Sequence, residues 1–240
     1  MSPGQLPTDD LGRVIRFWVA RLGAPADAFR RAGAVFVPTP SEQVVVVSVG
    51  RGAVVLGPPR VRAALLGLDP SAALDGTTVT ERLLPFGARL EGEATLMYLS
   101  AERFRPCSGR VRPATPVDVA EVLDRSSPAD VDESSLDGTA ESVVALAAGD
   151  QPVSLARLAV WDDEVAQLSV LTVPGHRRGG HAAVAASAVV VSALQRGLIP
   201  QWRVRVGHLA SESLARRLGF VPAGRQALIV LPDVRRGVID

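Results

Sequence analysis

The chain has 240 residues, of which 47% are hydrophobic and 21% are charged, so it can bury a sizeable core and long disordered stretches are excluded. The formal net charge is +1, which excludes the strong overall basic charge typical of proteins that bind nucleic acid or anionic membranes. The sequence contains no lysine, so mechanisms that need a Schiff-base lysine or a phosphate-loop lysine are also excluded.

The single cysteine and the apolar runs limit the compartment and the cofactors. Cys107 cannot form an internal disulfide or a thiolate zinc cluster, and an incidental thiol in a reducing cytosol is favoured over a nucleophile. The N-terminal segment lacks the basic and apolar pattern of a signal peptide. The longest near-apolar run, Ala182 to Leu194, is shorter than the about 20 residues that span a membrane. We therefore expect a cytoplasmic protein with no metal site, no membrane span and no nucleic-acid partner.

The first part of the chain predicts a small α/β unit. Apolar residues follow Asp9 and Asp10 at helical spacing, which predicts an N-terminal helix with acids at its positive end. Residues 26–33 predict a second short helix. Three strands are expected after it, and the second, residues 43–50, is almost wholly β-branched and is therefore expected at the centre of a sheet.

A helix and further strand structure complete this unit. Thr78 and Glu81 form a capping-box pattern, which predicts a helix that begins at Thr78. Residues 88–100 predict either a strand pair or one bent strand. The polar stretch that follows contains proline and glycine and indicates a domain boundary. It separates residues 1–105, an N-terminal α/β accessory domain, from residues 106–240, a second domain.

The second domain begins with a clear helix start. Thr115, Pro116 and Asp118 take the cap, first and third positions of a helix that follows a short strand. Residues 141–174 contain three strand runs joined by turn signals, which predicts an antiparallel meander. The last of these strands runs into a glycine-rich turn and a helix rich in alanine and valine. A strand, a short helix capped by Ser211 and a closing strand are expected after it.

The segment LTVPGHRRGGHAA, residues 171–183, joins the meander to the Ala/Val helix. A strand, a glycine-rich turn and a helix start together point several backbone N–H groups at one place, where the helix dipole adds positive charge. Arg177 and Arg178 add charge and forked donors that suit phosphate oxygens. The segment therefore predicts a phosphate or pyrophosphate site. A Walker loop is disfavoured because histidine follows Gly180, and a Rossmann site is disfavoured because the turn follows an antiparallel meander.

The order of motifs around this loop resembles one known family. Arg177, Gly180 and Ala182 give the pattern R-x-x-G-x-A, which resembles the CoA-pyrophosphate loop of the GNAT superfamily of acyl-CoA-dependent N-acyltransferases. The segment HLASESLARRLGF is similar to the family's closing element, although His208 stands where the family often has asparagine. It matches that element at Ser211, Leu214, Leu218, Gly219 and Phe220. The resemblance covers about residues 108–232, and no comparable resemblance is found before residue 105.

The resemblance implies an α/β (α+β) fold class, with a mixed, mostly antiparallel sheet flanked by helices in the C-terminal half. It also implies acetyl-CoA as co-substrate, bound where the fourth and fifth strands of that sheet splay apart. Leu171, Thr172 and Val173 would hold the pantetheine arm, with an N–H near Leu171 as oxyanion donor. The full set of cofactor-binding residues that it implies is Leu171, Thr172, Val173, Arg177, Arg178, Gly179, Gly180, His181, Ala182, Ala183, His208, Ser211 and Leu214. Three roles stay open for the N-terminal half: a degenerate copy of the same fold, a substrate-selecting lid or a dimerisation unit.

Two departures from the family pattern concern acid–base chemistry. The family often has a glutamate where this chain has Gln167, and a tyrosine where it has Ala215. Glutamine and alanine cannot exchange a proton, so other groups must do so. Tyr98, from the N-terminal half, is one further candidate to reach the site. The substitutes for base and acid are Glu164, His176, His208, Ser211 and water, and the predicted catalytic residues are Glu164, His208 and Ser211.

These features predict an N-acetyltransferase that transfers an acetyl group from acetyl-CoA to an amine of a small molecule or a protein. Direct attack needs no covalent enzyme intermediate, which agrees with the lack of a nucleophile motif. The alternative is a non-catalytic acyl-CoA-binding or interaction module, because both usual catalytic groups are replaced. A nucleotide-binding protein that uses the same loop is a third hypothesis, and a homodimer stays open.

Overall fold

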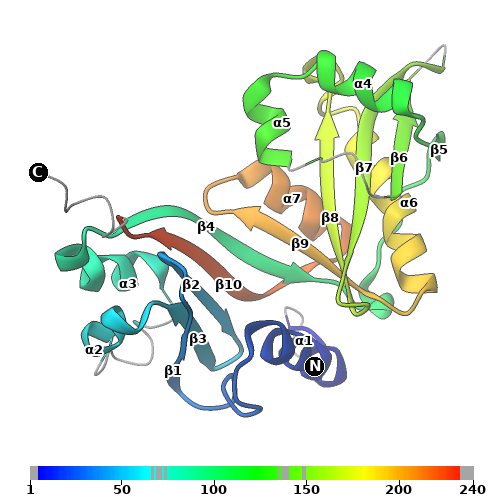
Figure 1. Ribbon diagram of the computed structural model, residues 1–240. Helices are drawn as coiled ribbons and strands as arrows, with labels where there is room; N and C mark the ends of the chain where they lie inside the picture. The colour runs from blue at the N-terminus through cyan, green and yellow to red at the C-terminus, as the bar shows by residue number, and fades with distance from the viewer. Residues whose placement is uncertain are drawn as a thin grey trace, which may run out of the picture. The chain divides into compact units, whose positions relative to one another are not determined.

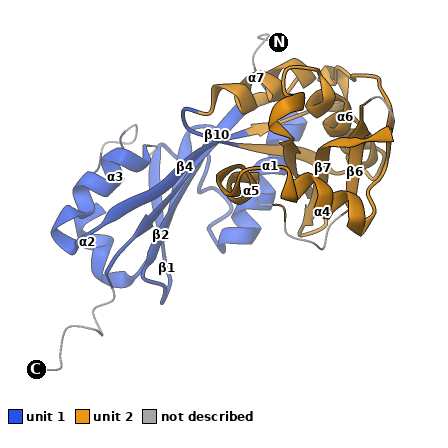
Figure 2. Cartoon of the chain, turned by 90° about the horizontal axis from the view of Figure 1, so that it is seen from above, with its two compact units in different colours: residues 1–96, 204–207, 222–240 blue, residues 97–203, 208–221 orange. Residues whose placement is uncertain are grey.

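The computed structural model describes residues 5–65, 68, 72, 75–134, 136, 141–147 and 150–232 (Figure 1). These residues form two compact units, coloured separately in Figure 2. Unit 1 holds the described residues up to Leu96, Val204–Gly207 and those from Pro222, whereas unit 2 holds Met97–Arg203 and His208–Val221. Neither unit is one continuous stretch of sequence. The boundary predicted at residue 105 separates two domains that are each continuous in sequence, which is a different division from these units. That boundary stays a prediction.

Unit 1 is built on strands in the order β1-β3-β2-β10-β4. β1 pairs with β3 in parallel, and β2 pairs antiparallel with both β3 and β10. The β-branched segment that was expected at the centre of a sheet is β2, and its two partners confirm that position. The strand bounds are β1 Gly33–Pro38, β2 Gln43–Val49, β3 Gly52–Gly57, β4 Arg89–Tyr98 and β10 Val221–Val230.

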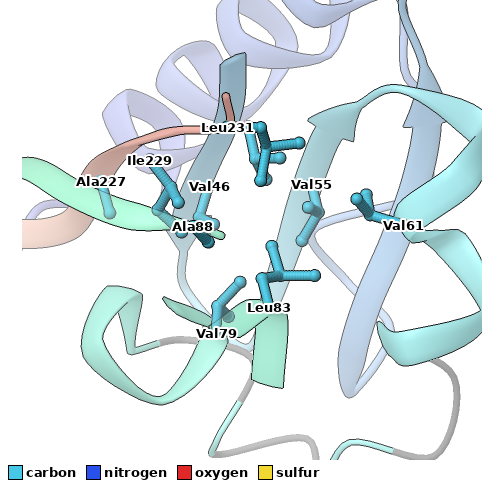
Figure 3. Close-up of a cluster of buried hydrophobic side chains, with 10 residues drawn as sticks. Val46, Val55, Val61, Val79, Leu83, Ala88, Ala227, Ile229 and Leu231 are labelled. Atoms are coloured by element: carbon cyan, nitrogen blue, oxygen red, sulfur yellow. The ribbon is translucent and has the colours of Figure 1, made fainter. Parts of the chain in front are cut away.

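The core of unit 1 is a cluster of aliphatic side chains between these strands and a short helix (Figure 3). Val46 of β2 and Val55 of β3 meet Val79 and Leu83 of α3, together with Ile229 of β10. Burial of such side chains is the main favourable term in folding, because it removes apolar surface from water. The helices of the unit are α1 Thr8–Leu22, α2 Arg62–Leu65 and α3 Gly76–Leu83, with 3-10 turns η1 Pro59–Val61 and η3 Leu84–Phe86.

Two local predictions for unit 1 are wrong, and one alternative is settled. Residues 26–30 form successive turns instead of a helix, and the N–H groups of Ala28 and Arg30 donate to the carbonyls three residues before them. The helix predicted to begin at Thr78 begins at Gly76, because the carboxylate of Asp75 accepts hydrogen bonds from the Thr78 N–H and hydroxyl. Residues 89–98 form the single strand β4 and not a strand pair.

Unit 2 has strands in the order β9-β8-β7-β6-β5. β5 to β8 pair antiparallel in sequence order, which confirms the predicted meander, and β8 pairs with β9 in parallel. The strand bounds are β5 Val111–Pro113, β6 Glu141–Leu146, β7 Pro152–Trp161, β8 Val165–Thr172 and β9 Ile199–Arg205. The predicted fold class, a mixed and mostly antiparallel sheet flanked by helices, is therefore confirmed.

Helices cover both faces of these strands. Figure 2 shows the strands of unit 2 between α4 and α5 on one side and α6 and α7 on the other. On the first side, Leu171 and Val173 pack with Val122 of α4 and Leu155 of β7. The helix bounds are α4 Pro116–Asp124, α5 Pro128–Ser134, α6 His181–Gln195 and α7 Leu209–Leu218, with 3-10 turns η4 Ala101–Arg103 and η6 Pro174–His176. None of the described helices is long and apolar enough to span a lipid bilayer.

The predicted start of α4 is confirmed in detail. The Thr115 hydroxyl accepts the Asp118 N–H at 3.3 Å, and the Asp118 carboxylate accepts the Thr115 N–H at 2.7 Å. Both terminal nitrogens of Arg112 donate to the same carboxylate. Hydrogen bonds from Arg112, and then from Thr115, hold the pKa of Asp118 far below its ordinary value against the opposing effect of burial. Side chains of the protein therefore cap this helix start, and we call such a helix start closed.

The predicted start of α7 needs a correction. His208, and not Ser211, is the N-cap, because its Nδ1 accepts the Ser211 N–H at 3.0 Å. A ring nitrogen can accept this bond as the side-chain oxygen of an asparagine does, so His208 can take the structural place of the family's asparagine. Serine is a common cap, and the sequence pattern alone therefore favoured the wrong residue.

Candidate functional site

The candidate site lies in unit 2, where β8 and β9 stop pairing. Their parallel register ends at Leu168 and Trp202, although β8 continues to Thr172. On its other edge, β8 stays paired with β7 as far as Thr172. Within the described chain, residues 169–172 therefore have a partner strand on the β7 side and none on the β9 side. This is the splayed arrangement that was expected between these two strands.

Successive residues of β8 point their backbone N–H and C=O groups to opposite edges of the strand, and this alternation decides which groups face the unpaired edge. The Val173 N–H donates to the Val153 carbonyl of β7 at 3.0 Å, and Leu171, two residues earlier, has the same orientation. Val170 and Thr172 consequently present their N–H and C=O groups to the β9 side. Of the three residues predicted to hold pantetheine, only Thr172 faces the unpaired edge with its backbone, and the predicted contacts stay a prediction. Val170 faces the same edge and was not among the predicted residues, because the sequence does not give the hydrogen-bonding parity of a strand.

The loop after β8 ends in an uncapped helix start. α6 begins after Gly180, whose φ is 84°, and no side chain of the described residues caps it. The N–H groups of His181, Ala182 and Ala183 have no acceptor inside the helix, as at any helix start. A Cβ on Gly180 would meet nothing within 4 Å, so the space on the side-chain side of Gly180 is open. Arg178 also has a positive φ, 64°, which is uncommon for a residue other than glycine.

Positive charge gathers around this helix start. Arg177 donates from Nε to the Thr172 carbonyl at 3.4 Å, and its Nη2 lies 2.8 Å from Oδ1 of Asp130 in α5. Arg178 is exposed, and the ring of His181 lies 6.2 Å from that of His176. The loop thus brings together the predicted phosphate-binding residues Arg177, Arg178, Gly179, Gly180, His181, Ala182 and Ala183.

His208 and Ser211 lie at the start of α7, and both make structural bonds. The Ser211 hydroxyl accepts the indole N–H of Trp202 at 3.0 Å, and His208 Nε2 lies 3.6 Å from Oε1 of Glu133 in α5. Because Nδ1 of His208 accepts a backbone N–H, the neutral ring carries its proton on Nε2. In this arrangement His208 has no free lone pair with which to act as a base. The catalytic roles predicted for both residues stay predictions.

Glu164 and Leu214 belong to elements other than the loop. Glu164 is in the β7–β8 turn, where its N–H donates to the Trp161 carbonyl at 3.1 Å. The strand from Glu164 to Val170 spans about 20 Å, so the structure does not bring this carboxylate to the unpaired edge. Leu214 is half-buried within α7, and its neighbour Ala215, at the position of the family's tyrosine, is fully buried.

A chain of hydrogen bonds reaches Gln167, which stands where the family often has glutamate. The hydroxyl of Tyr98 donates to Oε1 of Gln201 at 2.5 Å, and Nε2 of Gln201 donates to Oε1 of Gln167 at 2.7 Å. Nε2 of Gln167 in turn donates to the Leu168 carbonyl at 2.8 Å. Tyr98 and Gln201 are fully buried. Sequence reasoning missed Gln201; its only signal is a polar residue within an otherwise apolar strand start.

Residues 143–225 match the family model described as GNAT acetyltransferase. This range begins within β6 and contains β7, β8, the glycine loop, α6, β9 and α7. A comparison with curated protein sequences finds no match.

Two solved structures are similar in fold. A GCN5-related N-acetyltransferase from Sphaerobacter thermophilus aligns over 96% of this chain and 96% of its own, with a TM-score of 0.52 and 14% identity. A GNAT-family protein from Novosphingobium aromaticivorans aligns over 61% of this chain and 69% of its own, with a TM-score of 0.50 and 19% identity. The first alignment includes the N-terminal half, where the sequence shows no resemblance. The chain has the fold of the GNAT superfamily, and the predicted resemblance is confirmed.

Proposed function

We propose that the chain is an acyl-CoA-dependent N-acyltransferase that moves an acetyl group from acetyl-CoA to an amine of a small molecule or a protein. The observation that supports this best is the end of β8–β9 pairing at Leu168 and Trp202, followed along β8 by a glycine loop and the uncapped start of α6. An unpaired strand edge suits the amide groups of pantetheine, and an open helix start suits a pyrophosphate.

Each part of the cofactor has matching groups in this proposal. The outward C=O of Val170 and the outward N–H of Thr172 pair with the pantetheine amides. The first N–H groups of α6 bind the pyrophosphate, with Arg178 and Arg177 adding charge. The Val170 N–H takes the role that was predicted for an N–H near Leu171, and it polarises the thioester carbonyl.

The reaction follows from this placement. A neutral acceptor amine attacks the thioester carbonyl carbon, the new C–N bond forms and the C–S bond breaks. The proton that the amine loses passes through water to the CoA thiolate, because the amide of Gln167 cannot take it up. Products are the N-acetylated amine and free CoA, so atoms and charge balance. Most of the rate then comes from positioning and from the oxyanion donor.

The test is a screen of small amines and peptide amines with acetyl-CoA and a thiol-detecting reagent. We expect one or more amines to raise thiol release above the hydrolysis background, and this increase should be absent in a variant that cannot bind CoA. If CoA binds tightly and no amine raises thiol release, the enzyme proposal fails.

One observation favours a second candidate function, a non-catalytic acyl-CoA-binding module. Gln167 and Ala215 replace both usual proton-transfer groups, and both polar atoms of Gln167 are engaged in hydrogen bonds. This module predicts stabilisation by CoA with no thiol release for any amine. A nucleotide-binding protein instead predicts stabilisation by ATP as well as CoA, so a thermal-shift comparison of the two ligands separates it from both.

A further inference from the structure

The short helix α5 contacts two parts of the candidate site, through an ion pair made by Asp130 and a longer approach of Glu133 to a histidine. Asp130 and Glu133 are three residues apart and therefore share one helix face. Asp130 lies 2.8 Å from Nη2 of Arg177, in the loop before α6, and Glu133 lies 3.6 Å from Nε2 of His208, at the start of α7. One helix thus engages a predicted phosphate-binding arginine and the cap of the next helix.

The contact between Asp130 and Arg177 uses groups that a phosphate would need. Arg177 donates to Asp130 and to the Thr172 carbonyl, so its guanidinium is held between α5 and β8. A phosphate and Asp130 are competing anions for the one guanidinium of Arg177, whose remaining N–H groups on Nη1 and Nη2 can begin a phosphate contact before the Asp130 contact breaks. The Ser127 hydroxyl, and then Arg177, hold the pKa of Asp130 below its ordinary value, so this carboxylate is charged at neutral pH.

The strengths of the two contacts favour the phosphate. The side chains of Arg177 and Asp130 are 47% and 31% exposed, and an ion pair this exposed contributes less than about 1 kcal/mol. A forked arginine–phosphate contact is stronger, because it makes two charge-assisted hydrogen bonds to a group of higher charge. The Asp130 contact is therefore weak enough for a phosphate to displace it.

We propose that Asp130 is an internal competitor for Arg177, which a CoA phosphate displaces, so that cofactor binding releases one end of α5. The proposal rests on the function proposed above, since it needs CoA at the loop. Val131 packs against the apolar cluster that contains Leu171, and Glu133 keeps its partner, so α5 loosens without leaving the domain. A thioester of pantetheine alone, which has no pyrophosphate, leaves the contact closed.

The experiment is a double-mutant cycle on CoA affinity, measured by calorimetry. Asp130→Asn keeps an acceptor oxygen for the Ser127 hydroxyl and removes the charge, and we expect CoA to bind about two- to five-fold more tightly. In an Arg177→Ala background the same change should have no effect, because nothing is left to compete for. Asp132→Asn, an exposed acid on the same helix, is the matched control and should change the affinity less.

Four outcomes decide the matter. Tightening that depends on Arg177 supports the competitor. Equal tightening with and without Arg177, or in Asp132→Asn, shows a general effect of charge and overturns it. If the wild-type protein binds CoA and Asp130→Asn binds it no more tightly, the role of Asp130 as a competitor is overturned and the proposed function still stands. If the wild-type protein does not bind CoA, both proposals fail.

Discussion

Two helices of unit 2 begin in opposite ways. α4 begins with Thr115 and Asp118, which satisfy each other's backbone N–H groups, and with Arg112 on the same carboxylate. α6 begins at Gly180 with no capping side chain among the described residues. Both helix starts carry the same unsatisfied N–H groups and the same dipole. One is closed by the protein's own acid, and the other has no capping side chain among the described residues and is the place where we propose that an external anion binds. A helix start without an internal acid, next to arginines, is therefore a binding-site signal.

The most severe way to break this contrast is to give α6 an acid of its own. Gly180→Asp places a carboxylate at the pyrophosphate position, where repulsion between like charges at about 4 Å costs several kcal/mol. We expect CoA affinity to fall by at least about 100-fold. Calorimetric titration with CoA measures the loss.

Gly180→Asn is the matched control for that variant. Asparagine has nearly the same size and tolerates a positive φ, but it has no charge. It should keep CoA affinity within about ten-fold of wild type, and circular dichroism should show both variants folded. Equal losses in the two variants would place the pyrophosphate elsewhere.

The reverse change opens the closed helix start. Asp118→Ala removes the acceptor for Arg112 and for the Thr115 N–H, so we expect the free energy of unfolding to fall by about 2 to 4 kcal/mol. Affinity for CoA, measured on the folded fraction, should stay unchanged, because α4 has no part in the loop. Asp124→Ala, an exposed acid at the other end of α4, is the control and should cost less than about 0.5 kcal/mol.

The carboxylate of Asp118 also makes the stability of the protein depend on pH. The pKa of Asp118 is lowered in the folded state, so its stabilising effect is fully present above its unfolded pKa of about 3.9 and is lost as pH falls below that value. Urea unfolding from pH 6 to pH 3 should show wild type losing stability more steeply below pH 4 than Asp118→Ala. Parallel curves for the two proteins would contradict the assignment.

The smallest expected effect comes from the other half of the capping box. Thr115→Ala removes the hydroxyl that accepts the Asp118 N–H and leaves Arg112 on the carboxylate, so it should cost about 1 kcal/mol of unfolding free energy. Thr115→Ser retains the hydroxyl and should cost less than half of that in the same urea experiment. A larger loss for serine than for alanine would mean that the methyl group matters more than the hydrogen bond.

Local patterns predicted local structure well. The order of the meander strands and the Ala/Val helix follows from periodicity and turn residues, because these act over a few positions. The start of α4 was predicted to the residue, since capping chemistry is encoded within four positions. The loop was also predicted, because glycine and arginine mark it directly in the sequence.

Contacts between distant segments could not be predicted in this way. Tyr98 and Gln201 are 103 positions apart, and a buried amide–hydroxyl bond leaves no periodic signal. The bonds from α5 to Arg177 and His208 depend on how α5 packs against β8, which no local pattern states. The register between β8 and β7 decides which N–H groups of β8 face its unpaired edge. That register exists only in the folded sheet.

The buried hydrogen bond of Tyr98 has a practical consequence. Tyr98 is the chain's only tyrosine, so selective isotope labelling of tyrosine gives a single ring signal from this one position. Its hydroxyl is joined through Gln201 to Gln167, beside the point where β8 and β9 separate. The protein therefore carries a built-in spectroscopic reporter of the strand opening, which can follow ligand titrations without a substitution or an attached probe.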